Sequence, residues 1–265
     1  MKERSQLKKL IQALVVGVCF YCSLSSSELM AQANQEEILI HVMGVKPFGF
    51  IDVNDQTTKG IHYDIIGELA RRTNLKIKRI LLPYPRIWSG LQTGTHDGGI
   101  AWRSSDRDGF VVYVHFVFSD HISAFVLKGR KKLAKYEDLY TVGSVGFMRG
   151  LSISERFNQD DNILKYQIRT MEQSVLMLDK GRIDAVVGSI YSYLYLSNQI
   201  KMEHEIDFPG IRLGEREQWF QMSKKSKMLK YLPKIQTALA SMTKEKYPEK
   251  IYEKYLGTDF SKIEY

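Results

Sequence analysis

The sequence predicts an α/β fold made of two lobes. Short apolar stretches bounded by glycine or proline alternate with stretches whose apolar residues recur at helical spacing. The resulting order of strand, helix, strand, helix and strand is typical of a parallel sheet with helices on both faces. A second series of the same kind begins near residue 141, and no proline- or glycine-rich linker precedes it. Two α/β lobes joined by crossing strands would account for both observations.

The first half of the chain supplies three predicted strands, two predicted helices and two further extended segments. The strands and extended segments lie at residues 38–43, 76–82, 96–101, 112–118 and 124–127. The longer helix covers residues 60–74, because Ile61, Ile65 and Leu69 are spaced by four and share one face. The shorter helix covers residues 87–92, and Gly94 ends it.

The second half repeats this alternation with different residues. Two strands are predicted at residues 141–147 and 183–188. Between them, Ser152 is expected to cap the start of a helix, because Glu155 follows three residues later. The next helix carries an apolar stripe of Met171, Val175 and Leu178. A last amphipathic helix is predicted at residues 228–246.

The amino-terminal residues 1–33 are typical of a secretory signal peptide. Four basic residues precede an apolar run at residues 10–20, and the small-residue site Ala31-Gln32-Ala33 follows. The run is shorter than the roughly 20 residues that a membrane-spanning helix needs, which disfavours an anchor. The sequence therefore predicts export to the periplasm with cleavage after Ala33.

Both cysteines of the chain fall inside this predicted signal. Val18 precedes Cys19 and Tyr21 precedes Cys22, whereas a lipid-modified cysteine normally follows a small residue. Cleavage would leave 265 − 33 = 232 residues without any cysteine. We therefore expect a product without lipid that depends on its apolar core and not on disulfides.

Charge and composition narrow the classes of partner. Residues 1–33 hold four basic and two acidic residues, so their removal changes the net charge from +8 to 8 − 2 = +6. The basic residues are spread along the chain, without a nucleic-acid motif, and no nucleic-acid partner is predicted. The six histidines show no metal-ligand spacing, so neither a metal nor another cofactor is predicted.

The segment at residues 84–107 carries the strongest functional signal. A helix, a short apolar strand and a polar turn follow one another, and the turn contains Ser104, Ser105 and Arg107. Open α/β sheets bind ligands at the carboxyl ends of their strands. Arginine can hold a carboxylate through two parallel hydrogen bonds. This turn therefore predicts a site for a small anion.

Several short patterns occur in a fixed order along the chain. They are Pro47-Phe48-Gly-Phe50, Gly60-Ile-His-Tyr-Asp64, the set Tyr84, Arg86, Leu91, Gly94 and Asp97, Ser104-Ser-Asp-Arg107, Gly150-Leu-Ser152, Gly181-Arg-Ile-Asp184-Ala, and Ile251-Tyr-Glu-Lys-Tyr-Leu-Gly257. Through them the chain resembles the periplasmic solute-binding proteins of polar amino acid ABC transporters, the extracellular family 3 type. One family segment departs here, because Phe118-Ser-Asp-His-Ile lacks the usual proline and tyrosine.

The resemblance implies a two-lobed periplasmic-binding-protein fold of type II-like topology, with the lobes joined by two crossing strands. Lobe one would comprise residues 34–123 plus 220–265, and lobe two residues 124–219. A small anionic or amino-acid-like solute would bind in the cleft, and hinge closure would bury it. The protein would be a monomer without enzymatic activity, and its partner would be an ABC permease or a membrane receptor.

The resemblance also implies roles for individual residues. The implied ligand-binding residues are Arg107, Ser104, Ser152, Tyr84, Phe48, Phe50, Trp102 and Ser189. Arg107 and Ser104 would hold a carboxylate, Ser152 would present a helix start to it, and the aromatic residues would form apolar walls.

Ser189 stands where amino-acid binders of this family commonly have an Asp for the α-ammonium. Serine cannot neutralise a buried ammonium, and an unpaired buried charge is costly. Two alternatives remain open. Either Asp120 or a glutamate from the region of Glu203 to Glu217 supplies the charge, or the ligand is not a standard α-amino acid.

Two other functions are compatible with the same pattern. The first is a ligand-sensing module that presents its closed form to a membrane receptor. The second is an exported dehydratase-like enzyme on the same fold, which would need a poised pair of titratable groups. Asp120 and His121 are the candidate pair, but neighbouring residues on a strand point to opposite faces. We therefore expect binding without chemistry.

Overall fold

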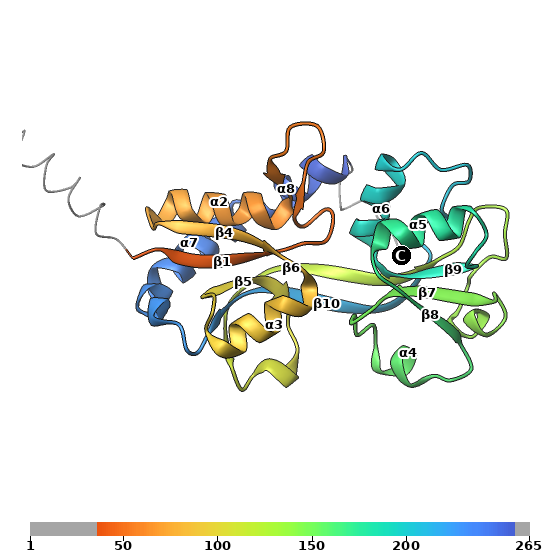
Figure 1. Ribbon diagram of the computed structural model, residues 1–265, viewed down its shortest axis with the longest axis horizontal. Coiled ribbons are helices and arrows are strands. Elements are labelled where there is room, and N and C mark those ends of the chain that lie inside the picture. Colours follow the sequence, from red (N-terminus) through yellow and green to blue (C-terminus); the bar gives the residue numbers. More distant parts are fainter. Residues whose placement is uncertain (1–35, 258–265) are drawn as a thin grey trace, which may run out of the picture. The chain divides into compact units, whose positions relative to one another are not determined.

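The computed structural model describes residues 36–257, and the predicted signal peptide lies outside the described residues. From Ile38 onward the described residues belong to one compact unit (Figure 1). Among residues 36–257, no helix combines the length and the apolar character that crossing a membrane requires.

One eight-stranded sheet runs through this unit. Its strands are β1 (Ile38–Met43), β4 (Ile77–Leu82), β5 (Gly98–Trp102), β6 (Val111–Phe125), β7 (Ser144–Met148), β8 (Leu164–Ile168), β9 (Ala185–Ser189) and β10 (Ile211–Ser223). The spatial order is β4-β1-β5-β10-β6-β9-β7-β8. The pairs β4–β1, β1–β5, β9–β7 and β7–β8 are parallel. Strands β10 and β6 pair antiparallel with each other, β10 also pairs antiparallel with β5, and β6 with β9. Strands β2 (Phe50–Ile51) and β3 (Thr58–Lys59) form a separate hairpin.

The long strands β6 and β10 belong to both halves of the sheet. They pair with each other along their length, β10 pairs with β5 at Gln218–Met222, and β6 pairs with β9 at Ile122–Phe125. The hydrogen-bonded sheet is therefore continuous, and the two lobes share its central pair of strands.

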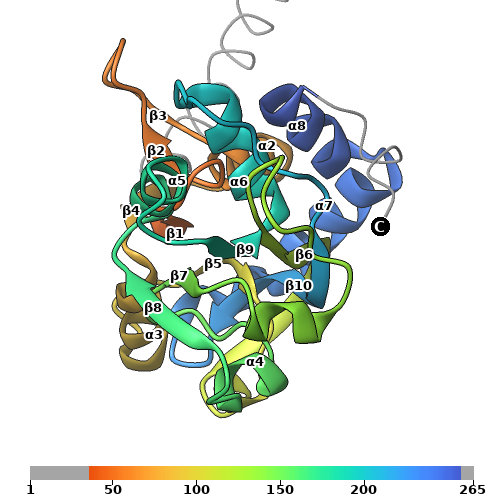
Figure 2. The same cartoon turned by 90° about the vertical axis from the view of Figure 1, so that its right-hand side faces the viewer.

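Helices cover both faces of each half of the sheet (Figures 1 and 2). Helices α2 (Ile61–Thr73), α3 (Tyr84–Thr93), α7 (Leu232–Lys244) and α8 (Tyr247–Leu256) lie with β4, β1 and β5, and we call this half lobe one. Helices α4 (Glu155–Gln159), α5 (Met171–Asp179) and α6 (Ile190–Gln199) lie with β9, β7 and β8, and we call this half lobe two. Short 3-10 turns occupy Ser105–Arg107, Tyr136–Tyr140 and Lys227–Tyr231.

Most predicted elements of the first half are present. Strand β1 has its predicted bounds, and α2 ends at Asn74, which adopts a left-handed conformation. Helix α3 begins at Tyr84, three residues before its prediction, with Pro85 in its first turn. The two extended segments at residues 112–118 and 124–127 are parts of one strand, β6.

Three expectations for the second half were wrong or incomplete. The cap of α4 is Ser154, whose hydroxyl accepts a hydrogen bond from the Phe157 amide at 3.3 Å, and not Ser152. The helix predicted at residues 228–246 is a 3-10 turn followed by α7, and α8 follows it. Strands β8 and β10 and helix α6 were not predicted at all.

Aromatic side chains join the two lobes at the crossing strands. The ring of Tyr252 from α8 stacks on Phe118 from β6, with 4.1 Å between ring centroids. Tyr191 from α6 packs edge-on against Tyr252 at 5.3 Å. Tyr252 is fully buried, so this cluster anchors the start of α6 and the last helix to the same strand.

Candidate interlobe binding site

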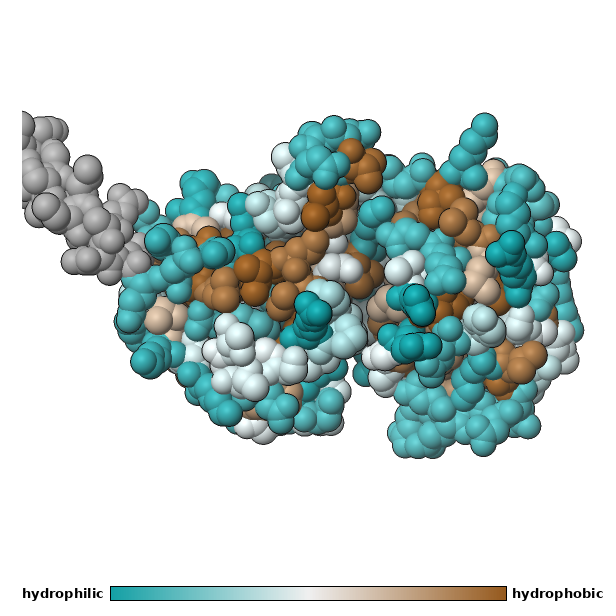
Figure 3. Space-filling model, in the orientation of Figure 1, coloured by the Kyte–Doolittle hydropathy of each residue, from teal (hydrophilic) through white to brown (hydrophobic). Residues whose placement is uncertain are grey.

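A cavity of about 450 Å³ opens between the two lobes. Figure 3 shows the surface hollowed at this place. Lobe one lines it with Gly44, Val45, Lys46, Gly49, Phe50, Leu81, Pro83, Tyr84 and Pro85, and lobe two with Met148, Arg149, Gly150, Arg169, Thr170, Met171 and Glu172. The volume falls within the range of sites for small molecules.

Most of these residues follow the carboxyl ends of four parallel strands. Residues 44–46 come directly after β1, residues 83–85 after β4, residues 149–150 after β7, and residues 169–172 after β8. Parallel pairing places the carboxyl ends of neighbouring strands at one edge of the sheet, and open α/β sheets bind ligands there. The topology of the sheet therefore positions the cavity.

The loop after β1 is held by the amino end of α2. The amides of Ile61 and His62 donate to the carbonyls of Pro47 and Phe48, each at 2.9 Å. Gly60 adopts φ +133°, and a Cβ at this position would lie 2.5 Å from the Phe48 carbonyl oxygen. This close approach requires glycine and holds Phe50 at the cavity.

Positive charge dominates the lining. Its charged residues are Lys46, Arg149, Arg169 and Glu172. Lys46 of lobe one forms an ion pair with Glu172 of lobe two at 3.5 Å, so the one acid of the lining is already partnered. Within residues 36–257, no hydrogen bond or ion pair engages the guanidinium of Arg149 or Arg169.

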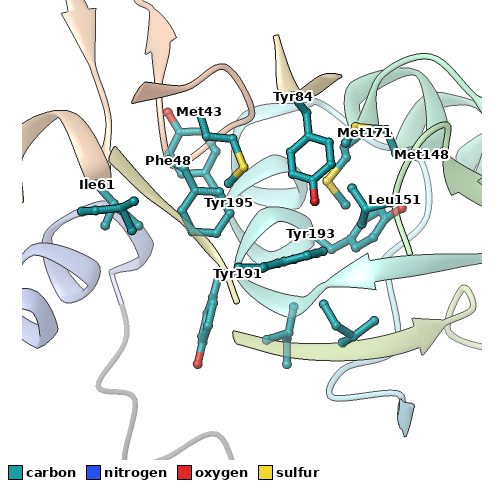
Figure 4. Packing of buried hydrophobic residues seen from close by; sticks show 14 of the residues in the cluster. Met43, Phe48, Ile61, Tyr84, Met148, Leu151, Met171, Tyr191, Tyr193 and Tyr195 are labelled. Carbon is teal, nitrogen blue, oxygen red and sulfur yellow. The ribbon is translucent and has the colours of Figure 1, made fainter. Parts of the chain in front are cut away.

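Apolar side chains from both lobes complete the walls. Figure 4 shows Tyr84 of lobe one beside Met171 of lobe two, with Met148 close by. The Tyr84 ring packs edge-on against Trp88, with 5.4 Å between ring centroids. The ring centroids of Phe50 and Tyr195 are 5.7 Å apart. Burial raises the pKa of the Tyr84 phenol, and the neighbouring Arg107 guanidinium opposes that rise.

Of the eight residues implied by the resemblance, Phe50 and Tyr84 line this cavity. Phe48 is 1% exposed and packs against His62 at 4.8 Å between ring centroids. Trp102 is also buried, and its indole nitrogen donates to Asp120 at 3.1 Å. Both rings belong to the core of the crossing region.

Arg107 and Ser104 contact residues of the neighbouring elements β5, α3 and β6. Nη1 of Arg107 donates to the Trp102 carbonyl at 2.7 Å, and the guanidinium lies 3.3 Å from the Trp88 ring centroid. The backbone of Ser104 hydrogen-bonds the Tyr113 hydroxyl through its amide and its carbonyl. These contacts hold the turn, and the guanidinium lies against an aromatic face.

Ser152 is exposed on lobe two. Its hydroxyl accepts from the Asn158 amide at 2.8 Å, and its carbonyl accepts from Arg216 of β10 at 3.1 Å. Ser152 thus contacts a crossing strand and does not cap α4.

Ser189 lies against a buried acid. Its hydroxyl donates to the Asp120 carboxyl at 2.7 Å, and Trp102 and Gln218 donate to the same carboxyl at 3.1 and 3.4 Å. Burial raises the pKa of Asp120 to about 7, although these three hydrogen bonds oppose the rise. Nε2 of His62 lies 2.5 Å from the Gln218 side-chain oxygen, and burial lowers the pKa of His62 to about 4.

The glutamates considered as substitutes for the missing Asp have other partners. Glu203 pairs with Lys180, Glu205 with Lys128, Glu215 with Arg212, and Glu217 accepts from the Trp219 indole. Each is exposed, and none lines the cavity. Among the acids that the sequence offers as partners for an ammonium, only Asp120 therefore lies beside Ser189.

The cations of the cavity were missed by the sequence prediction. Arg149 lies two residues after the strand predicted at residues 141–147 and directly after β7, so its position near a strand end was a usable signal. Arg169 follows β8, which was not predicted. Leu164 and Tyr166 of β8 are exposed, which removes the apolar signal of a buried strand.

Among residues 36–257, no group of three or more His, Cys, Asp or Glu side chains is placed to hold a metal ion. A search of curated protein sequences gave no match.

Solved structures share this fold. A histidine kinase sensor domain with similarity to periplasmic binding proteins is 17% identical, with a TM-score of 0.72 over 85% of this chain and 98% of that chain. ArgBP from T. maritima, in mutant form, is 20% identical, with a TM-score of 0.69 over 84% and 96%. The substrate-binding protein of an amino acid ABC transporter is 19% identical, with a TM-score of 0.68 over 84% and 100%.

These likenesses show the two-lobed periplasmic-binding-protein fold, with β6 and β10 as its crossing strands. The model of one family matches residues 39–258 of the sequence, which is nearly all of the described chain. The chain belongs to the bacterial extracellular solute-binding proteins, family 3.

Proposed function

We propose that the protein captures a small anionic or amino-acid-like solute between its lobes and delivers it to an ABC-type importer. The observation that carries this proposal is the cavity at the carboxyl ends of β1, β4, β7 and β8, lined by three cations and one acid. Apolar walls with a few convergent polar groups are typical of small-molecule sites. An excess of positive charge favours an anionic ligand.

Hinge closure would bury the bound solute. We propose that lobe one comprises residues 34–123 plus 220–265 and lobe two residues 124–219. The strand pairing supports this division, since β6 pairs with lobe two from Ile122 onward and β10 pairs with lobe one from Gln218 onward. The hinge would then lie in the residues of β6 just before Ile122 and in the residues of β10 just before Gln218.

The ligand would lack an α-ammonium. Asp120 lies beside Ser189, but its raised pKa leaves its carboxyl partly protonated at neutral pH, which makes it a weak partner for a cation. We therefore propose that common L-amino acids bind poorly. Arg107, Ser104, Ser152, Phe48 and Trp102 remain proposed ligand residues for a form in which the lobes are arranged differently.

A sensing role is the second candidate. The same fold occurs in the histidine kinase sensor domain named above. In this case the closed form would dock with a membrane receptor and not with a permease. Loss of solute uptake in cells lacking the protein would support import, whereas intact uptake with a lost response to the solute would support sensing.

We propose binding without chemistry. The single acid that lines the cavity, Glu172, is paired with Lys46, so the lining offers no free acid beside a base. An exported dehydratase-like activity would need such a pair. Incubating the protein with each identified ligand and finding a product by mass spectrometry would contradict this proposal.

We also propose that the protein is exported by cleavage after Ala33 and acts as a monomer in the periplasm. Amino-terminal sequencing of the native protein tests the cleavage, and a chain that begins at Cys19 or Cys22 would refute it. Sedimentation of the cleaved protein tests the monomer.

Calorimetry on the cleaved protein tests the binding function. The panel should contain small carboxylates, phosphonates, sulfonates and the common amino acids. We expect micromolar binding of at least one anion and binding of amino acids in the millimolar range or weaker. Micromolar binding of an ordinary amino acid would overturn the ligand class, and a complete absence of binding across the panel would overturn the function.

A further inference from the structure

Two exposed arginines of lobe two line the cavity and follow neighbouring strands. Strands β7 and β8 are parallel, and Met148 pairs with Ile168 in their register. Arg149 is the residue after β7, and Arg169 is the residue after β8. The Arg149 amide donates to the Ile168 carbonyl at 2.8 Å. The backbones of neighbouring strands are about 4.8 Å apart. The two guanidiniums are therefore attached at adjacent points of one edge.

The two guanidiniums carry charge that the described residues do not neutralise. Glu172 is the one acid of the lining, and its ion pair joins it to Lys46. Neither Arg149 nor Arg169 has a carboxylate partner within residues 36–257. Two like charges at adjacent strand ends repel each other, and an anion between them would replace repulsion with attraction.

The lining and the volume of the cavity indicate the chemistry of the rest of the ligand. Phe50, Tyr84, Met148 and Met171 supply apolar walls from both lobes, and the volume of about 450 Å³ admits more than a bare inorganic ion. Arg107 is not a lining residue of this cavity: its Nη1 donates to the Trp102 carbonyl, its guanidinium lies against the Trp88 ring, and the Tyr84 phenol is its neighbour. Of the three cations that line the cavity, the two without an ion pair among the described residues, Arg149 and Arg169, belong to lobe two.

We propose that Arg149 and Arg169 together bind a doubly charged oxyanion group of the solute, and that its apolar body packs between Phe50, Tyr84 and Met171. This inference rests on the proposed solute-binding function and names the chemistry of its substrate class. Guanidinium groups hold phosphate-like groups through paired hydrogen bonds, and two of them match three oxygens of one such group.

Titration calorimetry with phenylphosphonate, benzoate and benzyl alcohol tests the inference. These probes share an aromatic body and differ in charge. Phenylphosphonate should bind at least about tenfold more tightly than benzoate, and benzyl alcohol should not bind measurably. Arg149→Gln and Arg169→Gln should each weaken phenylphosphonate binding roughly 10- to 100-fold, the usual effect of losing a hydrogen bond to a charged group.

Arg182→Gln is the matched control, because Arg182 is an exposed arginine of lobe two that does not line the cavity. It should bind phenylphosphonate as the unchanged protein does. Far-ultraviolet circular dichroism and the unfolding temperature should be the same for all three variants, since each residue is exposed.

The outcomes separate the inference from the function on which it rests. If both arginine variants keep the affinity of the unchanged protein, or if benzoate binds as tightly as phenylphosphonate, the inference is wrong while the solute-binding function stands. If no phosphonate of either panel binds but a singly charged anion of the wider panel does, the doubly charged class is wrong. If nothing on either panel binds, the function itself fails.

Discussion

At the scale of single residues, Asp120 is a buried carboxyl with a raised pKa. It lies on a crossing strand, is fully buried, and accepts hydrogen bonds from Ser189 on one lobe, Trp102 on the other, and Gln218 on the second crossing strand. A carboxyl that contacts both lobes and both crossing strands couples its protonation to the stability of this region.

The pH dependence of Asp120 has a definite sign. Its pKa is about 7 in the folded protein and about 3.9 in an unfolded chain, so between these values the folded state binds more protons. The contribution of this group to the free energy of unfolding therefore falls as pH rises through this window. Asp120→Asn cannot ionise, so as pH rises from 4.5 to 7.5 it should gain about 3 kcal/mol of stability relative to the unchanged protein.

Denaturant unfolding of both proteins across this range measures the difference. A difference in free energy that stays flat or shrinks as pH rises would contradict the assignment. His62→Gln is an informative control, because the pKa of His62 is lowered from 6.5 to about 4. Between these values the unfolded state binds more protons, so the contribution of His62 has the opposite sign.

At the scale of elements, the loops at the carboxyl ends of the strands decide the chemistry of the cavity. Helix α5 begins directly after Arg169, with Thr170 as its cap, and α3 begins at Tyr84 with Pro83 before it. The short connection from strand to helix fixes where the backbone of these residues lies. Local signals that end a strand and start a helix thus place charged and aromatic groups at the cavity.

The cap of α4 offers a direct test at this scale. Ser154→Ala removes the hydroxyl that accepts from the Phe157 amide and should lower the free energy of unfolding by about 1 kcal/mol. Ser152→Ala removes an exposed hydroxyl that does not cap the helix. This substitution should change the free energy of unfolding by less than about 0.5 kcal/mol. Chemical denaturation compares the two. A larger loss for Ser152→Ala would restore Ser152 as the cap.

At the scale of the whole molecule, two of the contacts that join the lobes differ in their exposure to solvent. The aromatic cluster of Phe118, Tyr191 and Tyr252 packs at the crossing strands and is buried or half-buried. The Lys46–Glu172 ion pair spans the cavity, and both side chains are about one-third exposed. The buried cluster is suited to a permanent hinge, whereas the exposed pair can open and close with the cleft.

Glu172→Gln should therefore shift the molecule toward an open form without unfolding it. An exposed ion pair contributes about 0.2–1 kcal/mol, so the ratio of open to closed molecules should rise by up to about fivefold. Small-angle scattering without ligand should report a larger radius of gyration. Glu203→Gln breaks an ion pair within lobe two and should leave the radius unchanged. Equal radii for both variants would show that the pair does not hold the cleft.

The sequence by itself determined the fold class and most elements of lobe one. Ile61, Ile65 and Leu69 define α2 through their spacing, and all three are fully buried. These signals are local, because the spacing of apolar residues that marks a helix or a strand involves only residues close together in the sequence. The order of the short motifs also sufficed to identify the family, which the match over residues 39–258 confirmed.

Only the tertiary structure decided which polar groups meet. Asp120 contacts Ser189 across 69 residues of sequence, and Arg149 meets the end of β8 because β7 and β8 pair in register. Strand β8 has exposed apolar residues at the sheet edge, so no local alternation marked it and Arg169 was overlooked. Strand order and register arise from contacts between distant segments, and a local pattern does not encode which strand a given strand will pair with.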